Sequence, residues 1–328
     1  MTDLLGFSAI SQGCIGGLYN DKSFSRLAPG IRRCFQAASS AHNRVAGRLL
    51  RHHLFRCMSD VRAIGVFDSG IGGLTVVKAL RELLPNEKIF YLGDTARVPY
   101  GGKSASTVER YSLEIADILI EENAKIVVVA CNTASSVALA KLEEHLPVPV
   151  TGVIRPGARA AIAATRNGHV GVIGTRATIK SGAYEQELRR LSPDVRISVC
   201  ACPLLVPLIE EGWLDDELTD HVIARYLGPL VREGIDTLVM GCTHYPLLVH
   251  AISRALPKTV SLVDSARNCA IAVQELLVQE QLSAPSANSA GLEIALTDAP
   301  DMFFGVARRA LQLDIGDVQL REILHTVR

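Results

Sequence analysis

The chain has 328 residues, about twice the commonest length of one domain, which predicts two domains or one large α/β unit. Its 34 basic and 34 acidic residues cancel, and this balance argues against binding to nucleic acid or to an anionic membrane surface. Hydrophobic residues make up 48% and charged residues 21%, so a globular chain is expected rather than a disordered one, and no apolar stretch is long enough to span a membrane.

The first 57 residues differ in charge from the rest of the chain. They hold eight basic and two acidic side chains, whereas residues 58–328 hold 26 basic and 32 acidic ones. Three interpretations are open: a targeting segment, a flexible basic arm, or residues upstream of the true start at Met58. Because regular α/β patterning begins immediately after Met58, we favour the third and predict that residues 1–57 are an extension, disordered or upstream of the true start. No secretory signal peptide is evident, so a cytoplasmic protein is expected.

From Ala63 onward, apolar runs alternate with amphipathic segments. In chain order the pattern predicts strand Ala63–Phe67, helix Leu74–Leu84, strand Lys88–Leu92, helix Thr107–Glu122, strand Lys125–Ala130, helix Thr133–His145, strands Val148–Val153 and Val170–Ile173, helix Gly182–Leu191, strand Arg196–Cys200, helix Asp216–Glu233, strands Thr237–Met240 and Ser261–Val263, and helix Ala266–Gln281. Residues 283–291 are interpreted as a linker before a last strand–helix unit at 293–313. Continuous apolar strands that alternate with helices predict parallel sheets covered on both faces.

A weak internal duplication underlies this pattern. Residues 125–134 and 237–246 can be aligned so that in each a strand ends in a small residue, followed by a cysteine and then by small polar residues. Residues 64–69 similarly resemble residues 170–175. Two α/β halves, each with one cysteine at the carboxyl end of a strand, would form a cleft at the edge where open α/β sheets bind their ligands.

The eight cysteines are too sparse for a disulfide scaffold and form no C-x₂-C pair of the kind that binds zinc. Cys131 and Cys242 each follow a strand and precede backbone amides that lower a thiol pKa. A single cysteine is most often a small buried hydrophobe, but two in matching contexts favour chemistry. Cys200 and Cys202 share one face of a predicted strand; a metal or redox role is conceivable, and buried packing is the favoured interpretation.

The glycine-rich turn at 68–73 follows the first strand and opens the first helix. It is not a dinucleotide-binding fingerprint, and it fails as a P-loop because Ile71 stands where a lysine is required. The turn instead places the carboxylate of Asp68 and the hydroxyl of Ser69 beside amides that can hold an anion. No cofactor and no metal are therefore expected.

Four motifs, in this order, resemble those of the glutamate racemases in the aspartate/glutamate racemase superfamily: FDSGIGGLTV at 67–76, GDTARVPYG at 93–101, ACNTAS at 130–135 and GCTHYP at 241–246. The resemblance begins near Ile64 and reaches the C-terminal unit. It implies two similar domains, each a parallel-sheet α/β sandwich, with the active site in the cleft between them. The chain would build the first domain from 58–155 plus 265–328 and the second from 156–264.

The resemblance also implies roles for individual residues. Cys131 would act on the α-proton of D-glutamate with help from Asp68, and Cys242 on that of L-glutamate with help from His244 and Glu210. Asp94 matches a carboxylate near the site whose role is less certain. The positions that match substrate-holding residues are Asp68, Ser69, Tyr100, Gly101, Asn132, Thr133, Thr178, Thr243 and His244.

The implied chemistry agrees with the pair of cysteines. Racemisation takes a proton from one face of the α-carbon and returns one to the other, which two acid/base groups on opposite faces do directly. The resemblance thus implies a cofactor-independent enzyme that supplies D-glutamate for peptidoglycan, acts on a small molecule, and binds neither nucleic acid nor membrane; a homodimer is left open. A racemase for aspartate or another acid, and a non-catalytic two-lobed protein that binds a small anion, remain as alternatives.

Overall fold

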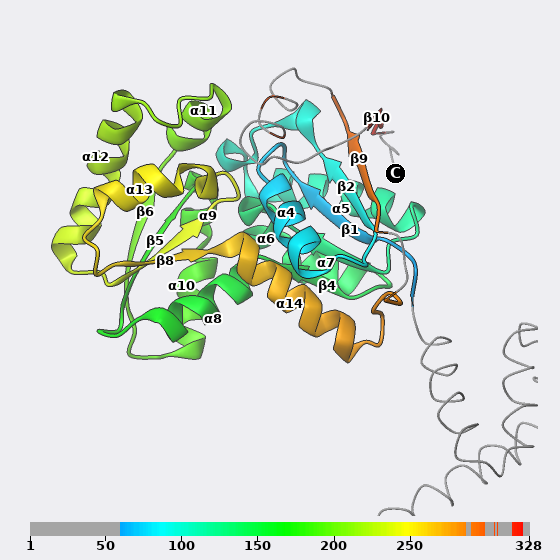
Figure 1. Ribbon diagram of the computed structural model, residues 1–328, viewed down its shortest axis with the longest axis horizontal. Helices are drawn as coiled ribbons and strands as arrows, with labels where there is room; N and C mark the ends of the chain where they lie inside the picture. Colours follow the sequence, from blue (N-terminus) through cyan, green and yellow to red (C-terminus); the bar gives the residue numbers. More distant parts are fainter. Residues whose placement is uncertain (1–59, 287–289, 299–304, 306, 308–316, 324–328) are drawn as a thin grey trace, which may run out of the picture. The chain divides into compact units, whose positions relative to one another are not determined.

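The computed structural model describes residues 60–286, 290–298, 305, 307 and 317–323. The prediction made for residues 1–57 lies outside this part of the chain. The described strands form two separate sheets, and every strand pair in both sheets is parallel (Figure 1). None of the described helices is both long and apolar enough to cross a membrane.

The first sheet has six strands in the order β10-β9-β2-β1-β3-β4. Their bounds are β1 (Ile64–Asp68), β2 (Ile89–Gly93), β3 (Ile126–Val129), β4 (Val150–Gly152), β9 (Leu292–Leu296) and β10 (Val318–Leu320). Every residue of β1 to β3 is buried, because helices cover both faces of these central strands. Phe67 stands opposite Leu92 on one side and Val129 on the other, so the carboxyl ends of the three strands lie level with one another.

The second sheet has four strands in the order β6-β5-β7-β8. Their bounds are β5 (His169–Gly174), β6 (Arg196–Ala201), β7 (Thr237–Gly241) and β8 (Ser261–Asp264). The two central strands, β5 and β7, are buried throughout, whereas in the edge strand β6 only Ser198 is buried.

The helices follow the strands in regular alternation. They are α4 (Leu74–Leu83), η2 (Thr95–Arg97), η3 (Tyr100–Gly102), α5 (Ala105–Glu121), α6 (Asn132–Val137), α7 (Leu139–His145), α8 (Ile154–Ala164), α9 (Arg176–Ser181), α10 (Ala183–Leu191), α11 (Leu205–Glu210), α12 (Glu217–Glu233), η4 (Tyr245–Leu248), α13 (Val249–Ala255) and α14 (Ser265–Gln279). The chain passes from the first sheet to the second through α8 and returns through α14.

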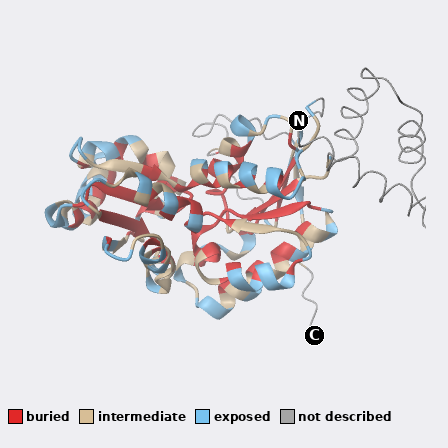
Figure 2. Ribbon diagram, turned by 90° about the horizontal axis from the view of Figure 1, so that it is seen from below, coloured by how far each residue is buried: buried red, intermediate tan, exposed pale blue. Residues whose placement is uncertain are grey.

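One apolar core joins the two sheets. It runs from Ile64 and Val128 in the first sheet to Val172 and Val239 in the second, and helices α4, α8 and α14 contribute to it. Helix α14 packs against both α4 and α8. Figure 2 shows the central strands of both sheets as buried elements. A continuous core of this kind holds the two strand edges, and any side chains on them, at a fixed separation.

These features confirm the predicted fold class of two parallel-sheet α/β units, although several helices differ from the prediction. Helix α8 was missed because Pro156 and Gly157 suggest a turn; Pro156 in fact occupies the first helical turn, where a missing N–H costs nothing. The helix predicted for 133–145 is two helices, α6 and α7, that meet at Ala138. The short helices α9, α11 and α13 were also missed, and most of the unit predicted for 293–313 after β9 lies outside the described residues.

Candidate active site

Both cysteines singled out in the sequence lie at strand ends and line one cleft of about 260 Å³. Cys131 follows β3 and caps α6, where its Sγ accepts a hydrogen bond from the backbone N–H of Ala134 at 3.5 Å. Cys242 follows β7 in the other sheet. The other predicted site residues that line this cleft are Ser69, Tyr100, Gly101, Asn132, Thr133, Glu210, Thr243 and His244.

Asp68 ends β1 and is fully buried behind the cleft. Its Oδ1 accepts the backbone N–H of Gly70 at 3.1 Å, and its Oδ2 accepts the hydroxyl of Thr243 at 3.4 Å. The second bond joins the two sheets, because Thr243 follows β7. Burial raises the pKa of the Asp68 carboxyl, and the nearby charge of His244 opposes this rise.

The surroundings of Cys131 favour the protonated thiol, so the expectation that backbone amides lower its pKa is wrong: the bond from Ala134 does lower the pKa, but burial outweighs it. The Cys131 sulfur lies 3.5 Å from the hydroxyl oxygen of Ser69, which comes directly after Asp68. Burial is the largest influence on this thiol, and together with the charge of Asp68 it raises the pKa of Cys131 to about 12. At neutral pH this side chain is therefore a thiol rather than a thiolate.

Cys242 belongs to a chain of three titratable groups. Its Sγ lies 3.8 Å from Nδ1 of His244, and Nε2 of the same ring lies 3.2 Å from Oε1 of Glu210. Burial alone would lower the pKa of His244, but the bonds to Cys242 and Glu210 outweigh it and raise that pKa to about 10. A protonated imidazole therefore stands next to the Cys242 sulfur, where it can exchange a proton with it.

Asn132 and Thr133 connect the amino end of α6 to the second sheet's helices. The hydroxyl of Tyr184 donates to the side-chain oxygen of Asn132 at 2.7 Å. The Thr133 hydroxyl lies 3.0 Å from that of Thr175 and 3.3 Å from that of Thr178. Thr175 lines the cleft, whereas Thr178 is buried behind it and holds the other two hydroxyls in place.

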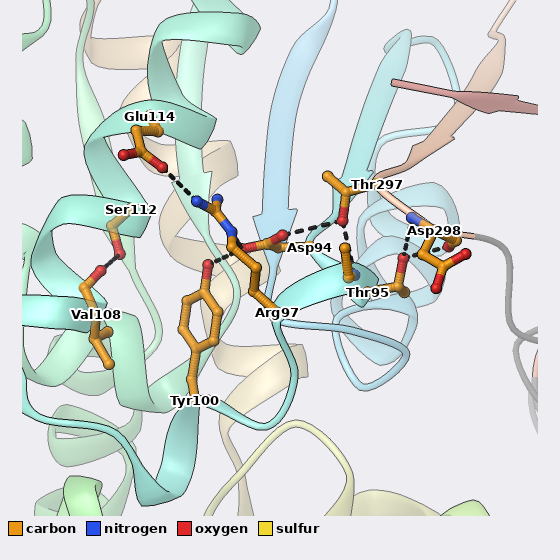
Figure 3. Close-up of polar contacts among 10 residues, drawn as sticks. Asp94, Thr95, Arg97, Tyr100, Val108, Ser112, Glu114, Thr297 and Asp298 are labelled. Carbon is orange, nitrogen blue, oxygen red and sulfur yellow. Dashed lines mark hydrogen bonds and ion pairs between the residues drawn. The ribbon is translucent and has the colours of Figure 1, made fainter. Parts of the chain in front are cut away.

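Asp94, which directly follows β2, is fully buried and does not line the cleft; Figure 3 shows its polar contacts. Its Oδ2 accepts hydrogen bonds from the Tyr100 hydroxyl and, at 2.7 Å, from Nε of Arg97. Its Oδ1 accepts the Thr297 hydroxyl at 3.0 Å, which ties the group to the end of β9. Because Tyr100 itself lines the cleft, Asp94 acts on the cleft through the position of that tyrosine.

The structure thus separates the predicted residues into two layers. Asp68, Asp94 and Thr178 lie behind the wall of the cleft, and the other predicted residues form the wall. Sequence reasoning missed Thr175 as a wall residue, although the duplication that pairs residues 64–69 with 170–175 places it opposite Ser69. It also missed further wall residues: Gly70, Val98, Pro99, Gly102, Arg176, Cys202, Pro203, Val206 and Pro207.

A second hollow lies elsewhere on the molecule. The hollow is larger, about 870 Å³, and lies between α4, α13 and α14, but none of the predicted site residues lines it. Most of the side chains predicted to carry the chemistry therefore line the smaller cleft. Among the residues that the structure describes, no group of three or more His, Cys, Asp or Glu side chains is arranged to hold a metal ion.

Comparison with known proteins agrees with this geometry. Residues 64–275 match the family model for Asp/Glu/Hydantoin racemase. A glutamate racemase of Geobacter metallireducens is 52% identical over 258 residues, covering 78% of this chain and 95% of the relative. A glutamate racemase of Neisseria meningitidis is 46% identical over 260 residues, covering 79% of this chain and 96% of the relative.

Solved structures are similar over the same region. A glutamate racemase from Bacillus anthracis is 40% identical with a TM-score of 0.76, covering 79% of this chain and 97% of that one. A glutamate racemase from Francisella tularensis in complex with D-glutamate is 35% identical with a TM-score of 0.75, covering 80% and 98%. With two strand-end cysteines in one cleft and matches of this extent, the chain belongs to the Asp/Glu/Hydantoin racemase family.

Proposed function

We propose that this chain is a glutamate racemase that interconverts L- and D-glutamate by proton transfer through two cysteines, without a cofactor. The observation that carries the proposal is that Cys131 and Cys242, from different sheets, line the same cleft. A substrate held between them presents opposite faces of its α-carbon to the two sulfur atoms. One thiolate can then remove the α-proton while the opposite thiol supplies its replacement.

The unequal surroundings of the two cysteines suit this division of labour. For L-glutamate, Cys242 takes the α-proton, with His244 beside it at 3.8 Å and Glu210 behind. Cys131 donates from the other face, which agrees with a thiol whose pKa is raised to about 12. For D-glutamate the direction of proton transfer reverses: Cys131 takes the α-proton, and Asp68, whose pKa is also raised, assists it.

The rest of the wall supports binding of an amino acid. Hydroxyls of Ser69, Thr133 and Thr243 and the amide of Asn132 can hydrogen-bond the substrate's ammonium and carboxylate groups. Such donors also stabilise the negative charge that develops when the weakly acidic α-proton leaves, more strongly in a site that excludes water. Tyr100 and Gly101 border the same cleft, and Asp94 and Thr178 position these wall residues from behind.

We propose glutamate rather than aspartate as the substrate because two relatives, 52% and 46% identical and matched over nearly their whole length, are glutamate racemases. Within the proposal, the domains are 58–155 plus 265–328 and 156–264, in keeping with the sorting of the strands into two sheets. The proposed setting is the cytoplasm, where thiols stay reduced and D-glutamate can enter peptidoglycan synthesis, with no nucleic-acid or membrane partner.

The test is solvent-deuterium exchange combined with racemisation of L- and D-glutamate, without added cofactor. Cys131→Ala and Cys242→Ala should each lower racemisation by about 10²–10⁴-fold or more, because one base can serve only one face. Cys269→Ala, which alters a buried cysteine outside the cleft, is the matched control and should remain active. A racemising single variant at either cleft cysteine would refute the two-thiol mechanism. α-Deuterium incorporation excludes a mere binding protein, and a higher rate with aspartate would reassign the substrate.

A further inference from the structure

Two more cysteines lie next to the cleft, and the proposed reaction does not use them. Cys200 is near the end of the edge strand β6, and Cys202 follows that strand directly. The Cys202 thiol donates a hydrogen bond to the Cys200 sulfur at a distance of 4.0 Å between the two Sγ atoms. The sequence predicted buried packing for this pair, but Cys202 also forms part of the cleft wall.

The two sulfur atoms differ in how an outside molecule can reach them. Cys202 is fully buried, with an exposed fraction of 0%. Cys200 is only partly buried, because it lies on an edge strand whose outer side has no neighbouring strand in the described sheet. A reagent in solution therefore meets Cys200 before Cys202.

From this geometry we propose that Cys200 and Cys202 are a redox modification site, in which a small disulfide oxidises the pair to an intramolecular disulfide that slows the enzyme. The reagent class is a low-molecular-weight disulfide, such as oxidised glutathione. The regulatory half of the proposal depends on the proposed racemase function of the cleft, whereas the chemical half does not.

The exchange is balanced in two steps. The Cys200 thiolate attacks one sulfur of the small disulfide, forms a mixed disulfide and expels one small thiolate. The Cys202 sulfur then attacks the Cys200 sulfur, forms the Cys200–Cys202 bond and expels the second small thiolate, which takes up the Cys202 proton. The protein loses two electrons and two protons, and the small disulfide becomes two thiols.

The local chemistry favours Cys200 as the attacking group. The hydrogen bond from the Cys202 thiol lowers the pKa of Cys200 to about 7, close to the value at which a thiol reacts fastest at neutral pH. The pKa of Cys202 is raised by the same bond and by burial, so this sulfur stays protonated until the mixed disulfide lies beside it. The order of the two steps follows from the difference between the two thiols.

Closing the disulfide must change the cleft. The sulfur atoms have to move from 4.0 Å to about 2.05 Å, a displacement of roughly 2 Å shared between the two residues. Cys202 is tied to the site on two sides: its N–H donates to the carbonyl of Gly174 at 2.8 Å, and its carbonyl accepts the Tyr245 hydroxyl at 3.2 Å. Gly174 precedes the wall residue Thr175, and Tyr245 follows His244. A misplacement of about 1 Å in a catalytic site can cost about 10²-fold in rate.

The test oxidises the full chain with oxidised glutathione, blocks the remaining free thiols with N-ethylmaleimide, and measures tryptic peptides by mass. Residues 197–225 form one tryptic peptide that contains Cys200 and Cys202 and no other cysteine. We expect this peptide to lose two hydrogen atoms and take up no maleimide. Racemisation should fall by at least about tenfold in parallel, and dithiothreitol should restore both.

Two variants separate this pair from the cleft cysteines. Cys200→Ser should keep its activity under conditions that inactivate the parent, because the entry point for the oxidant is gone. Cys269→Ser, altered at a fully buried cysteine outside the cleft, should respond as the parent does. A doubly alkylated 197–225 peptide after activity has fallen would overturn the proposal, and so would a formed disulfide with unchanged activity. A chain without racemase activity would refute the proposed function only, because the peptide mass reads the disulfide independently.

Discussion

Gly72 offers a direct way to disturb the Cys242 side of the cleft from the opposite sheet. This glycine lies in the turn between β1 and α4, and its backbone approaches His244 and Thr243. A Cβ atom added at Gly72 would lie 2.7 Å from Cε1 of the His244 ring and closer still to Nδ1 and to the Thr243 hydroxyl. Ordinary contact begins at 3.4 Å, so Gly72→Ala must displace the ring.

The size of the effect follows from this displacement. The ring has to move by about 1 Å, and a misplacement of that size costs about 10²-fold in rate, or about 2.7 kcal/mol of transition-state stabilisation. Nδ1 of His244 is the atom that faces the Cys242 sulfur, so in the proposed mechanism the displaced ring slows proton transfer at Cys242. The same crowding costs about 1–3 kcal/mol of folding free energy, which leaves a chain that folds.

The assay follows racemisation of each enantiomer by circular dichroism, and urea unfolding reports stability. Because the two enantiomers have equal free energy in water, kcat/KM must fall equally in both directions. Gly291→Ala is the matched control, since a Cβ there meets nothing within 4 Å. An unchanged kcat/KM in folded Gly72→Ala would show that the position of His244 does not limit catalysis and would refute the reasoning.

Three further outcomes are expected. The pKa of His244 is raised from its ordinary value of 6.5 to about 10, so the folding stability that this group contributes is complete below pH 6.5 and is lost as pH rises toward 10. In urea unfolding measured across that range, Glu210→Gln should lose less stability with pH than the parent does. The same pH dependence in both proteins would show that the His244–Glu210 hydrogen bond does not raise the pKa. Lys125→Met should lower the free energy of unfolding by about 3–5 kcal/mol, because it leaves the buried carboxylate of Glu87, 2.6 Å from the Lys125 Nζ, without its ion pair. Lys141→Met removes an exposed ion pair with Glu109 and should lower it by less than about 1 kcal/mol. Equal losses of stability in thermal unfolding would contradict this difference. A chain that starts at Met58 keeps the whole region of family resemblance and should retain kcat/KM within about threefold, and a tenfold loss or an insoluble product would show that residues 1–57 contribute to the enzyme.

The strand ends could be predicted from the sequence because two independent signals coincide there. A buried parallel strand is a continuous apolar run, and this run ends where Asp68 follows Phe67 and where a cysteine and then a polar residue follow Ala130 and Gly241. Since the carboxyl ends of parallel strands meet at one edge, the side chains that follow must lie near one another. The duplication then indicates that each half supplies one cysteine.

The depth of each side chain at that edge could not be predicted. Asp68 ends β1 and Asp94 directly follows β2, so the two look similar in the sequence. Their position behind the wall depends on hydroxyl donors that are far away in the chain, Thr243 for Asp68 and Thr297 for Asp94. No local pattern encodes a partner more than 170 residues away, so the distinction between wall and support emerges only from the packing.

The two cleft cysteines follow strands of different sheets, β3 and β7, so the packing that holds the sheets together also sets the distance between the two thiols. A two-base reaction needs a fixed distance between the two sulfur atoms, and neither sheet alone can set it. Within the described residues, that distance depends on the core shared by α4, α8 and α14 and on hydrogen bonds between the sheets, such as Thr75 Oγ1 to the carbonyl of Thr243 at 3.0 Å. A close-packed core transmits small displacements rather than absorbing them. Substitutions in α8 or α14, far from the cleft, should therefore lower kcat through the separation of the thiols before they unfold the chain.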